Sequence, residues 1–161
     1  MKYIITENQL ERLSQEEKVL ELPSLLFFNN DWNLLQKYLE KKGNPKYSIE
    51  GNLDLRNTPI KSLGNLTSVG GDLILSNTPI KSLENLTSVG GNLDLYNSST
   101  ESLGNLTSVG DFLDLRGTQI KSLGNLTSVE GYLDLDYTPL SKMYTKKEIR
   151  NMVEVTGKIY M

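Results

Sequence analysis

A block of twenty residues recurs in register along the chain and constrains its fold more than any other feature. The clearest copy reads GDLILSNTPIKSLENLTSVG, with position 1 at its first glycine. Self-similarity at a fixed short period is typical of a solenoid, in which each repeat packs only on its neighbours. We therefore expect a stack of coils around one apolar core. The five copies begin at Gly51, Gly71, Gly91, Asp111 and Gly131.

Leucine occupies positions 3 and 5 of every copy, for example Leu73 and Leu75. Apolar residues that alternate with period two indicate a strand with one buried face. Positions 10, 13, 16 and 19 are also apolar in nearly every copy, and we expect all six positions to point inward. Position 10 is filled by Ile60, Ile80, Thr100, Ile120 and Leu140, and position 13 by Leu63, Leu83, Leu103, Leu123 and Met143.

Turn-forming residues mark the corners between these apolar positions. Position 8 carries a hydroxyl in every copy, such as Thr78. A hydroxyl there favours a stacked turn in which its oxygen bonds the backbone or a neighbouring side chain. The Gly70–Gly71 pair before the strand supplies a tight return of the chain. Each repeat is thus predicted to form one complete coil.

The residues before the repeats predict a helical N-terminal cap, which we place at residues 1–46. Leucines near one face predict a helix over residues 6–21. A second helix is predicted over 31–42, with Gly43 as its stop. The apolar run 22–28 between them needs other parts of the protein to cover it from solvent. Its sequence is compatible with both a helix and a loop. A cap is needed because the first coil otherwise exposes apolar side chains and strand edges.

The last repeat diverges and predicts a C-terminal cap at residues 141–161, after a solenoid of five repeats over 47–140. Thr145 and Glu148 have the spacing of a capping box, followed by apolar residues at helical spacing. We expect a short helix there. Residues 157–161 return to the register of the repeat and predict a last strand.

The spacing of the leucines, the threonine and the isoleucine resembles the leucine-rich repeat, with threonine where that family usually has asparagine or cysteine. One difference is that Val69 precedes Leu73 by four positions, where the usual repeat has three. Residues 85–95 also look like coils of receptor-L-domain solenoids. Both resemblances imply an α+β repeat protein: a short right-handed β-solenoid with a parallel sheet and a helical N-terminal cap. The near-identical repeats and the opening residues 1–7 resemble phage-encoded repeat proteins, which implies a viral or bacterial source.

Composition argues against several classes of function. Seventeen basic and 20 acidic residues give a net charge of −3, which disfavours nonspecific nucleic-acid binding. The absence of histidine and cysteine removes the commonest general base, the thiol nucleophile and thiolate metal ligands. Carboxylates on an open sheet have nothing to exclude water or raise a pKa. We expect no enzyme, no cofactor and no metal.

The chain has no apolar stretch of membrane-spanning length, and its first residues lack the apolar run of a signal peptide. No membrane partner is therefore predicted. The absence of cysteine fits a reducing compartment. We expect a cytoplasmic protein, in the host cytoplasm if its source is viral.

Positions 2, 4 and 6 alternate with the buried leucines, so their side chains are expected on one outer face of the sheet. They differ from coil to coil while the core positions stay nearly constant. That contrast is typical of a scaffold presenting a tailored surface, although drift at positions that the fold ignores gives the same pattern. The candidate partner-binding residues are Asn52, Asp54, Arg56, Asp72, Ile74, Ser76, Asn92, Asp94, Tyr96, Phe112, Asp114, Arg116, Tyr132, Asp134 and Asp136.

Aspartates stack at position 4, where Asp94, Asp114 and Asp134 lie in successive coils. Neighbouring strands are about 4.8 Å apart, so each neighbouring pair repels by roughly 1 kcal/mol in water. A calcium ion, the nearby Arg116 or a basic partner would relieve this repulsion. We favour a partner protein with a basic patch over an ion, because calcium sites usually add carbonyl oxygens from a folded loop.

These features predict a non-enzymatic protein-interaction module. Tyr96, Phe112 and Tyr132 are the expected anchors, since aromatic residues often dominate the energy of an interface. If the source is a phage, we expect the partner to be a host protein. The alternative is a structural virion or assembly component that forms a homo-oligomer through the last strand, whose edge is open to pairing.

Overall fold

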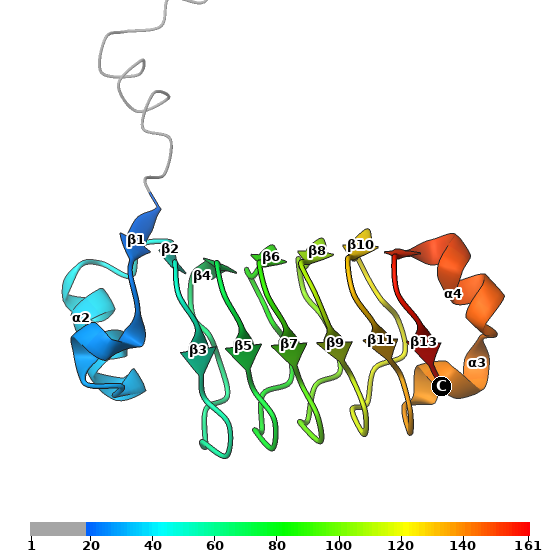
Figure 1. The fold of residues 1–161 in the computed structure, drawn as a ribbon. Coiled ribbons are helices and arrows are strands. Elements are labelled where there is room, and N and C mark those ends of the chain that lie inside the picture. The colour runs from blue at the N-terminus through cyan, green and yellow to red at the C-terminus, as the bar shows by residue number, and fades with distance from the viewer. Residues whose placement is uncertain (1–18) are drawn as a thin grey trace, which may run out of the picture.

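The computed structural model describes residues 19–161 as a parallel β-solenoid whose coils follow one another in sequence order (Figure 1). Helix α2 (Trp32–Lys41) lies at one end. Helices α3 (Pro139–Met143) and α4 (Lys146–Met152) lie at the other. The predicted fold class, a short α+β repeat protein built on a β-solenoid, is confirmed.

Two parallel sheets run along the solenoid, whereas the repeats predicted one. The leucine sheet, at positions 3 and 4, consists of β3 (Leu53–Asp54), β5 (Leu73–Ile74), β7 (Leu93–Asp94), β9 (Leu113–Asp114), β11 (Leu133–Asp134) and β13 (Ile159–Tyr160). The valine sheet, mainly at positions 18 and 19, consists of β1 (Leu20–Leu22), β2 (Tyr47–Ile49), β4 (Leu66–Val69), β6 (Ser88–Val89), β8 (Ser108–Val109), β10 (Ser128–Val129) and β12 (Glu154–Val155). Three of the seven valine-sheet strands are Ser-Val dipeptides, which are too short for a period-two pattern to appear.

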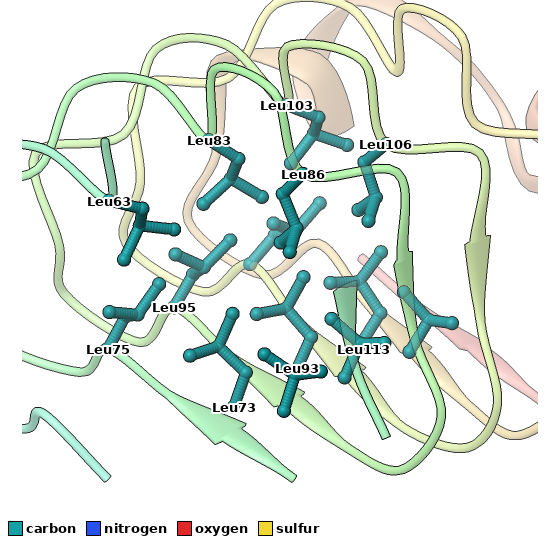
Figure 2. Close-up of a cluster of buried hydrophobic side chains, with 14 of the residues drawn as sticks. Leu63, Leu73, Leu75, Leu83, Leu86, Leu93, Leu95, Leu103, Leu106 and Leu113 are labelled. Carbon is teal, nitrogen blue, oxygen red and sulfur yellow. The ribbon is translucent and has the colours of Figure 1, made fainter. Parts of the chain in front are cut away.

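The core is a set of leucine columns running along the solenoid axis. The leucines at positions 3 and 5 are at most 2 % exposed. Leucines of successive coils point toward one another in the interior (Figure 2). The predicted inward set is buried with two exceptions. Ile60 of the first coil is only half-buried, and Met143 is 56 % exposed because α3 replaces the usual turn and directs its side chain outward.

The corners need special backbone geometry, as the repeated polar residues predict. Asn77 at position 7 has φ 57°, a left-handed conformation that asparagine tolerates better than most residues. A Cβ atom on Gly90 would lie 2.2 Å from the carbonyl oxygen of Gly70 in the preceding coil. The hydroxyl of Thr78 donates to the carbonyl oxygen of Leu75 at 2.7 Å, so the predicted turn at position 8 is confirmed.

The N-terminal end differs from its prediction in part. Most of the helix predicted over 6–21 lies outside the described residues. Its last residues form β1 instead, which pairs in parallel with β2. The alternation of Leu20, Glu21 and Leu22 suits an edge strand, and this pairing adds a row of backbone hydrogen bonds to the valine sheet.

The second predicted helix is present as α2. The Asp31 side chain caps it by accepting from two backbone N–H groups, the nearer at 2.8 Å. The apolar run before it forms the 3-10 helix η1 (Leu25–Phe28). Leu25 is buried, but Leu26 and Phe27 are mainly exposed, so the expectation that the whole run is covered is wrong for these two side chains.

The C-terminal end follows its prediction closely. Thr145 and Glu148 form the predicted capping box at the start of α4. The chain then returns to the repeat register, with Val155 opposite Val129 and Ile159 opposite Leu133. The predicted last strand is therefore present as β13, one more layer on the leucine sheet.

Arg150 closes the end of the last coil. Its guanidinium donates to the carbonyl oxygens of Val155 at 2.6 Å and Gly157 at 2.7 Å. One coil earlier, the corresponding carbonyls of Val129 and Gly131 accept backbone N–H groups from the following coil. Arg150 thus supplies the donors that another coil would have supplied.

Candidate binding face

The outward side of the leucine sheet, called the outer face below, carries the fifteen candidate residues at positions 2, 4 and 6. In-register pairing of the sheet stacks each position into a column that runs along the solenoid. The columns of positions 2 and 6 flank that of position 4. The structure therefore brings these residues together on one side of the sheet.

Position 2 has a structural role that the sequence analysis missed. The side-chain oxygen of Asn52 accepts from the backbone N–H of Asp72 at 2.8 Å. Asp72 accepts in the same way from Asn92 at 2.8 Å, and Asn92 from Phe112 at 3.1 Å. The run of Asn and Asp in three successive copies was the available signal. These side chains hold neighbouring coils in register.

Position 4 also shapes the backbone. A side-chain oxygen of Asp94 accepts from the N–H of Tyr96 at 2.9 Å, and Asp134 accepts from Asp136 at 3.0 Å. This is the local pattern by which aspartate stabilises a turn two residues ahead. Aspartate recurs at position 4 because it fixes the exit from the strand.

Two arginines at position 6 pair with three of the four aspartates at position 4. The Nε atom of Arg56 lies 2.9 Å from both carboxylate oxygens of Asp54, and this hydrogen bonding holds the pKa of Asp54 below its usual range. Arg116 binds Asp114 in the same way, at 2.9 Å and 3.0 Å. The suggested pairing of Arg116 with the aspartate column is therefore present in the structure.

Arg116 connects three coils. Beyond its bond to Asp114, its Nε lies 3.5 Å from a carboxylate oxygen of Asp134 in the next coil. On the other side its guanidinium carbon lies 5.1 Å from the centre of the Tyr96 ring, within cation–π range. This arrangement holds the centre of the outer face in one conformation.

Three candidate residues are not on the surface, which corrects the prediction. Asp114 is 3 % exposed, Asp134 8 % and Ser76 7 %. The two aspartates are covered because Arg116 lies against both. Ser76 is a short side chain in the column between the long side chains of Arg56 and Tyr96. The surface available to a partner consists of the remaining candidates.

Asp134 departs from the expectation that no carboxylate of this face has a raised pKa. Burial raises the pKa of Asp134, and the carboxylates of Asp136 and Asp114 raise it further. The N–H of Asp136 and the charge of Arg116 act in the opposite direction without cancelling the effect. The folded protein therefore holds this proton more tightly than the unfolded chain does.

The Asp134→Asn variant should become more stable relative to wild type as pH rises from 3 to 7. A raised pKa in the folded state contributes stability that is complete below the ordinary pKa of aspartate and is lost as pH rises through the folded value. Asparagine keeps the oxygen that accepts from Asp136 but does not titrate. Urea unfolding of both proteins across this range measures the difference, and a difference that is constant with pH would contradict the prediction.

Aromatic side chains are the most exposed apolar groups of the outer face. Tyr96 is 46 % exposed and Tyr132 49 %, while Phe112 is half-buried. Tyr160 on β13 is 40 % exposed, and its ring centre lies 6.1 Å from that of Tyr132. Tyr160 is not among the fifteen predicted candidates, although the register of residues 157–161 places it at position 4. Tyr160 thus adds a fourth aromatic side chain to Tyr96, Phe112 and Tyr132, one coil beyond Tyr132.

A second exposed apolar group lies on the N-terminal cap. Leu26, Phe27 and Leu34 are 69 %, 76 % and 43 % exposed. Nearby, a surface hollow of about 450 Å³ lies between the start of α2 and the first coil, beside Trp32 and Ile60. This hollow explains why Ile60 is less buried than its equivalents in later coils.

No protein-family model, curated protein or solved structure matches this chain. Within residues 19–161, no cluster of three or more acidic, histidine or cysteine side chains is placed to hold a metal ion. The helices of this described part are all too short or too polar to cross a bilayer. The geometry of the outer face therefore carries the functional argument.

Proposed function

We propose that the protein is a non-enzymatic interaction module that binds a partner protein through the outer face of its leucine sheet. The observation that carries this proposal is the exposure of Tyr96, Tyr132 and Tyr160 on a surface fixed by hydrogen bonds between coils. Rigid, exposed aromatic side chains are typical interface anchors because they bury a large area at little cost in conformational entropy.

The charge of the outer face supports a basic partner. Its fifteen candidate residues include six aspartates and two arginines, a formal net charge of −4. A partner with a complementary basic patch would associate faster and bind in a defined orientation. Because Arg56 and Arg116 already pair with three of the four aspartates at position 4, a protein partner explains this surface better than a metal ion does.

The source and location of the protein are part of the same proposal. The likeness of its repeats to leucine-rich and receptor-L-domain coils fits a binding scaffold. The likeness to phage-encoded repeat proteins favours a host protein as the partner and the host cytoplasm as the place of action. These elements of the proposal rest on the repeat sequence alone.

Replacing Tyr96 and Tyr132 with alanine together should weaken partner binding about thirtyfold or more, the loss expected for an interface anchor worth about 2 kcal/mol. Tyr137→Ala is the matched control, because Tyr137 is 86 % exposed and lies at position 7, beside the face. Photo-crosslinking from position 112 identifies the partner, and titration calorimetry with the purified partner measures each affinity. Equal losses in the double variant and the control would contradict the proposal.

A second candidate function is that of a structural component that self-associates. It is favoured by β13, which lies at the end of the leucine sheet and has β11 as its only partner strand within residues 19–161. Arg150 argues against self-association, since its guanidinium already occupies the carbonyl oxygens of Val155 and Gly157 at the same end of the solenoid. Light scattering over a concentration series separates the two functions: a constant 18.1 kDa species supports the interaction module, and growth with concentration supports self-association.

A further inference from the structure

We propose that the partner segment on the outer face is a basic amphipathic α-helix lying along the solenoid axis, across the strands. The inference rests on the proposed function and adds the shape and chemistry of the partner. Three features carry it: the spacing of the coils, the placement of the exposed tyrosines and the distribution of uncompensated charge.

The spacing of the coils favours a helix over an extended strand. Contact points on the outer face repeat once per coil, about every 4.8 Å. A helix presents side chains of one face about once per turn, or about every 5.4 Å, whereas a strand does so about every 6.7 Å. The coil of Asp72 and that of Asp136 are three steps apart. Over these steps the side-chain spacing of a helix departs from the coil spacing by about 2 Å in total, and that of a strand by about 6 Å. Flexible lysine and arginine side chains absorb the smaller drift only.

The exposed tyrosines fit the dimensions of a helix. Tyr96 and Tyr132 lie two coils apart, about 10 Å along the axis, which corresponds to the rise over about seven residues of a helix. They stand in the columns of positions 6 and 2, which are separated along the strand direction by about 13 Å. A helix with its side chains is about 10–12 Å wide, so one lying between the columns contacts a tyrosine on each side.

The uncompensated charge is spread along the same path. None of the ion pairs within residues 19–161 uses Asp72, Asp94 or Asp136, and Asp72 and Asp136 are the outermost of these three. They lie three coils apart, about 14 Å, which is close to the rise over ten residues of a helix. Lysine or arginine at two positions ten residues apart, with apolar residues between them, would therefore meet both carboxylates and the tyrosines.

Selection from a library of random peptides of about 16 residues tests this inference. Peptides are selected on the immobilised wild-type protein after those that bind the bare support have been removed, and the Tyr96→Ala/Tyr132→Ala variant is kept for the binding measurements alone. We expect the enriched peptides to carry lysine or arginine and apolar residues at helical spacing, and to gain helical circular dichroism on binding. By fluorescence anisotropy, their Kd should rise at least tenfold with the double variant and stay unchanged with Tyr137→Ala.

The possible outcomes separate this inference from the proposed function. Enriched peptides that depend on both tyrosines but alternate with period two, or that carry acidic residues, would overturn the basic helix and leave the binding face standing. Peptides that bind the wild type and the double variant equally would overturn the binding face as well. A library without enrichment would also overturn the basic helix, and the crosslinked partner would then decide the function of the face.

Discussion

Replacing Leu93 with alanine is expected to lower the free energy of unfolding by about 4 kcal/mol, near the upper end of the range for buried leucines. Leu93 is fully buried, and it stands in register between Leu73 and Leu113 of the neighbouring coils (Figure 2). The coils cannot close over the resulting cavity, because backbone hydrogen bonds hold their spacing. A loss of this size is a large part of the total stability of a domain.

Urea unfolding followed by circular dichroism measures this effect, and a fall in melting temperature of roughly 10 °C should accompany it. Met143→Ala is the matched control, since Met143 is 56 % exposed and its truncation should change stability by less than about 0.5 kcal/mol. If Leu93→Ala costs less than about 1 kcal/mol, the coils must relax into the cavity, and the rigidity assumed for the outer face is wrong.

The second large effect is expected at the corner, where Gly90→Ala should cost about 3 kcal/mol through overpacking. The new methyl group would lie 2.2 Å from the carbonyl oxygen of Gly70, and this contact is with backbone rather than with a side chain that can move. One of two hydrogen-bonded coils must therefore shift. The displacement weakens the bond from the Gly90 N–H to the carbonyl oxygen of Val69, which is 2.8 Å long in the wild type.

Glu130→Ala provides the control for this corner, because Glu130 occupies the same repeat position and already carries a Cβ atom. It is exposed, so its truncation should change the free energy of unfolding by less than about 0.5 kcal/mol. Thermal unfolding of both variants under the same conditions measures the contrast. Equal stability of the two variants would mean that the corner accommodates a methyl group and that the glycines serve another purpose.

The repeated positions made the architecture predictable. Leu73 and its equivalents revealed the leucine sheet because the same alternation, repeated five times in register, is typical of strands that stack in a solenoid. The capping box at Thr145 was predictable because its signal is local. The first two residues of the strand Leu20–Leu22 were predicted as helix because a strand of three residues carries too little pattern, and pairing with β2 decided its conformation.

The candidate face was predictable in position but not in detail. Alternation places Asp134 on the outer side of its strand, yet its burial depends on the course of the Arg116 side chain across two coils. The direction that the Arg116 side chain takes depends on three-dimensional packing, and the spacing of residues in the sequence does not determine it. The contact between Tyr132 and Tyr160 could have been found, since both residues follow from the repeat register.

Arg150 bonds to carbonyls that lie a few residues after it, so the C-terminal cap carries its own closure. A tandem duplication in the gene that copies one whole repeat would insert a coil without disturbing that cap or the N-terminal one. Each such event would lengthen the binding surface by about 4.8 Å. Loss of a repeat would shorten it by the same step. Gain or loss of whole repeats thus gives this protein a simple route to partners of different length.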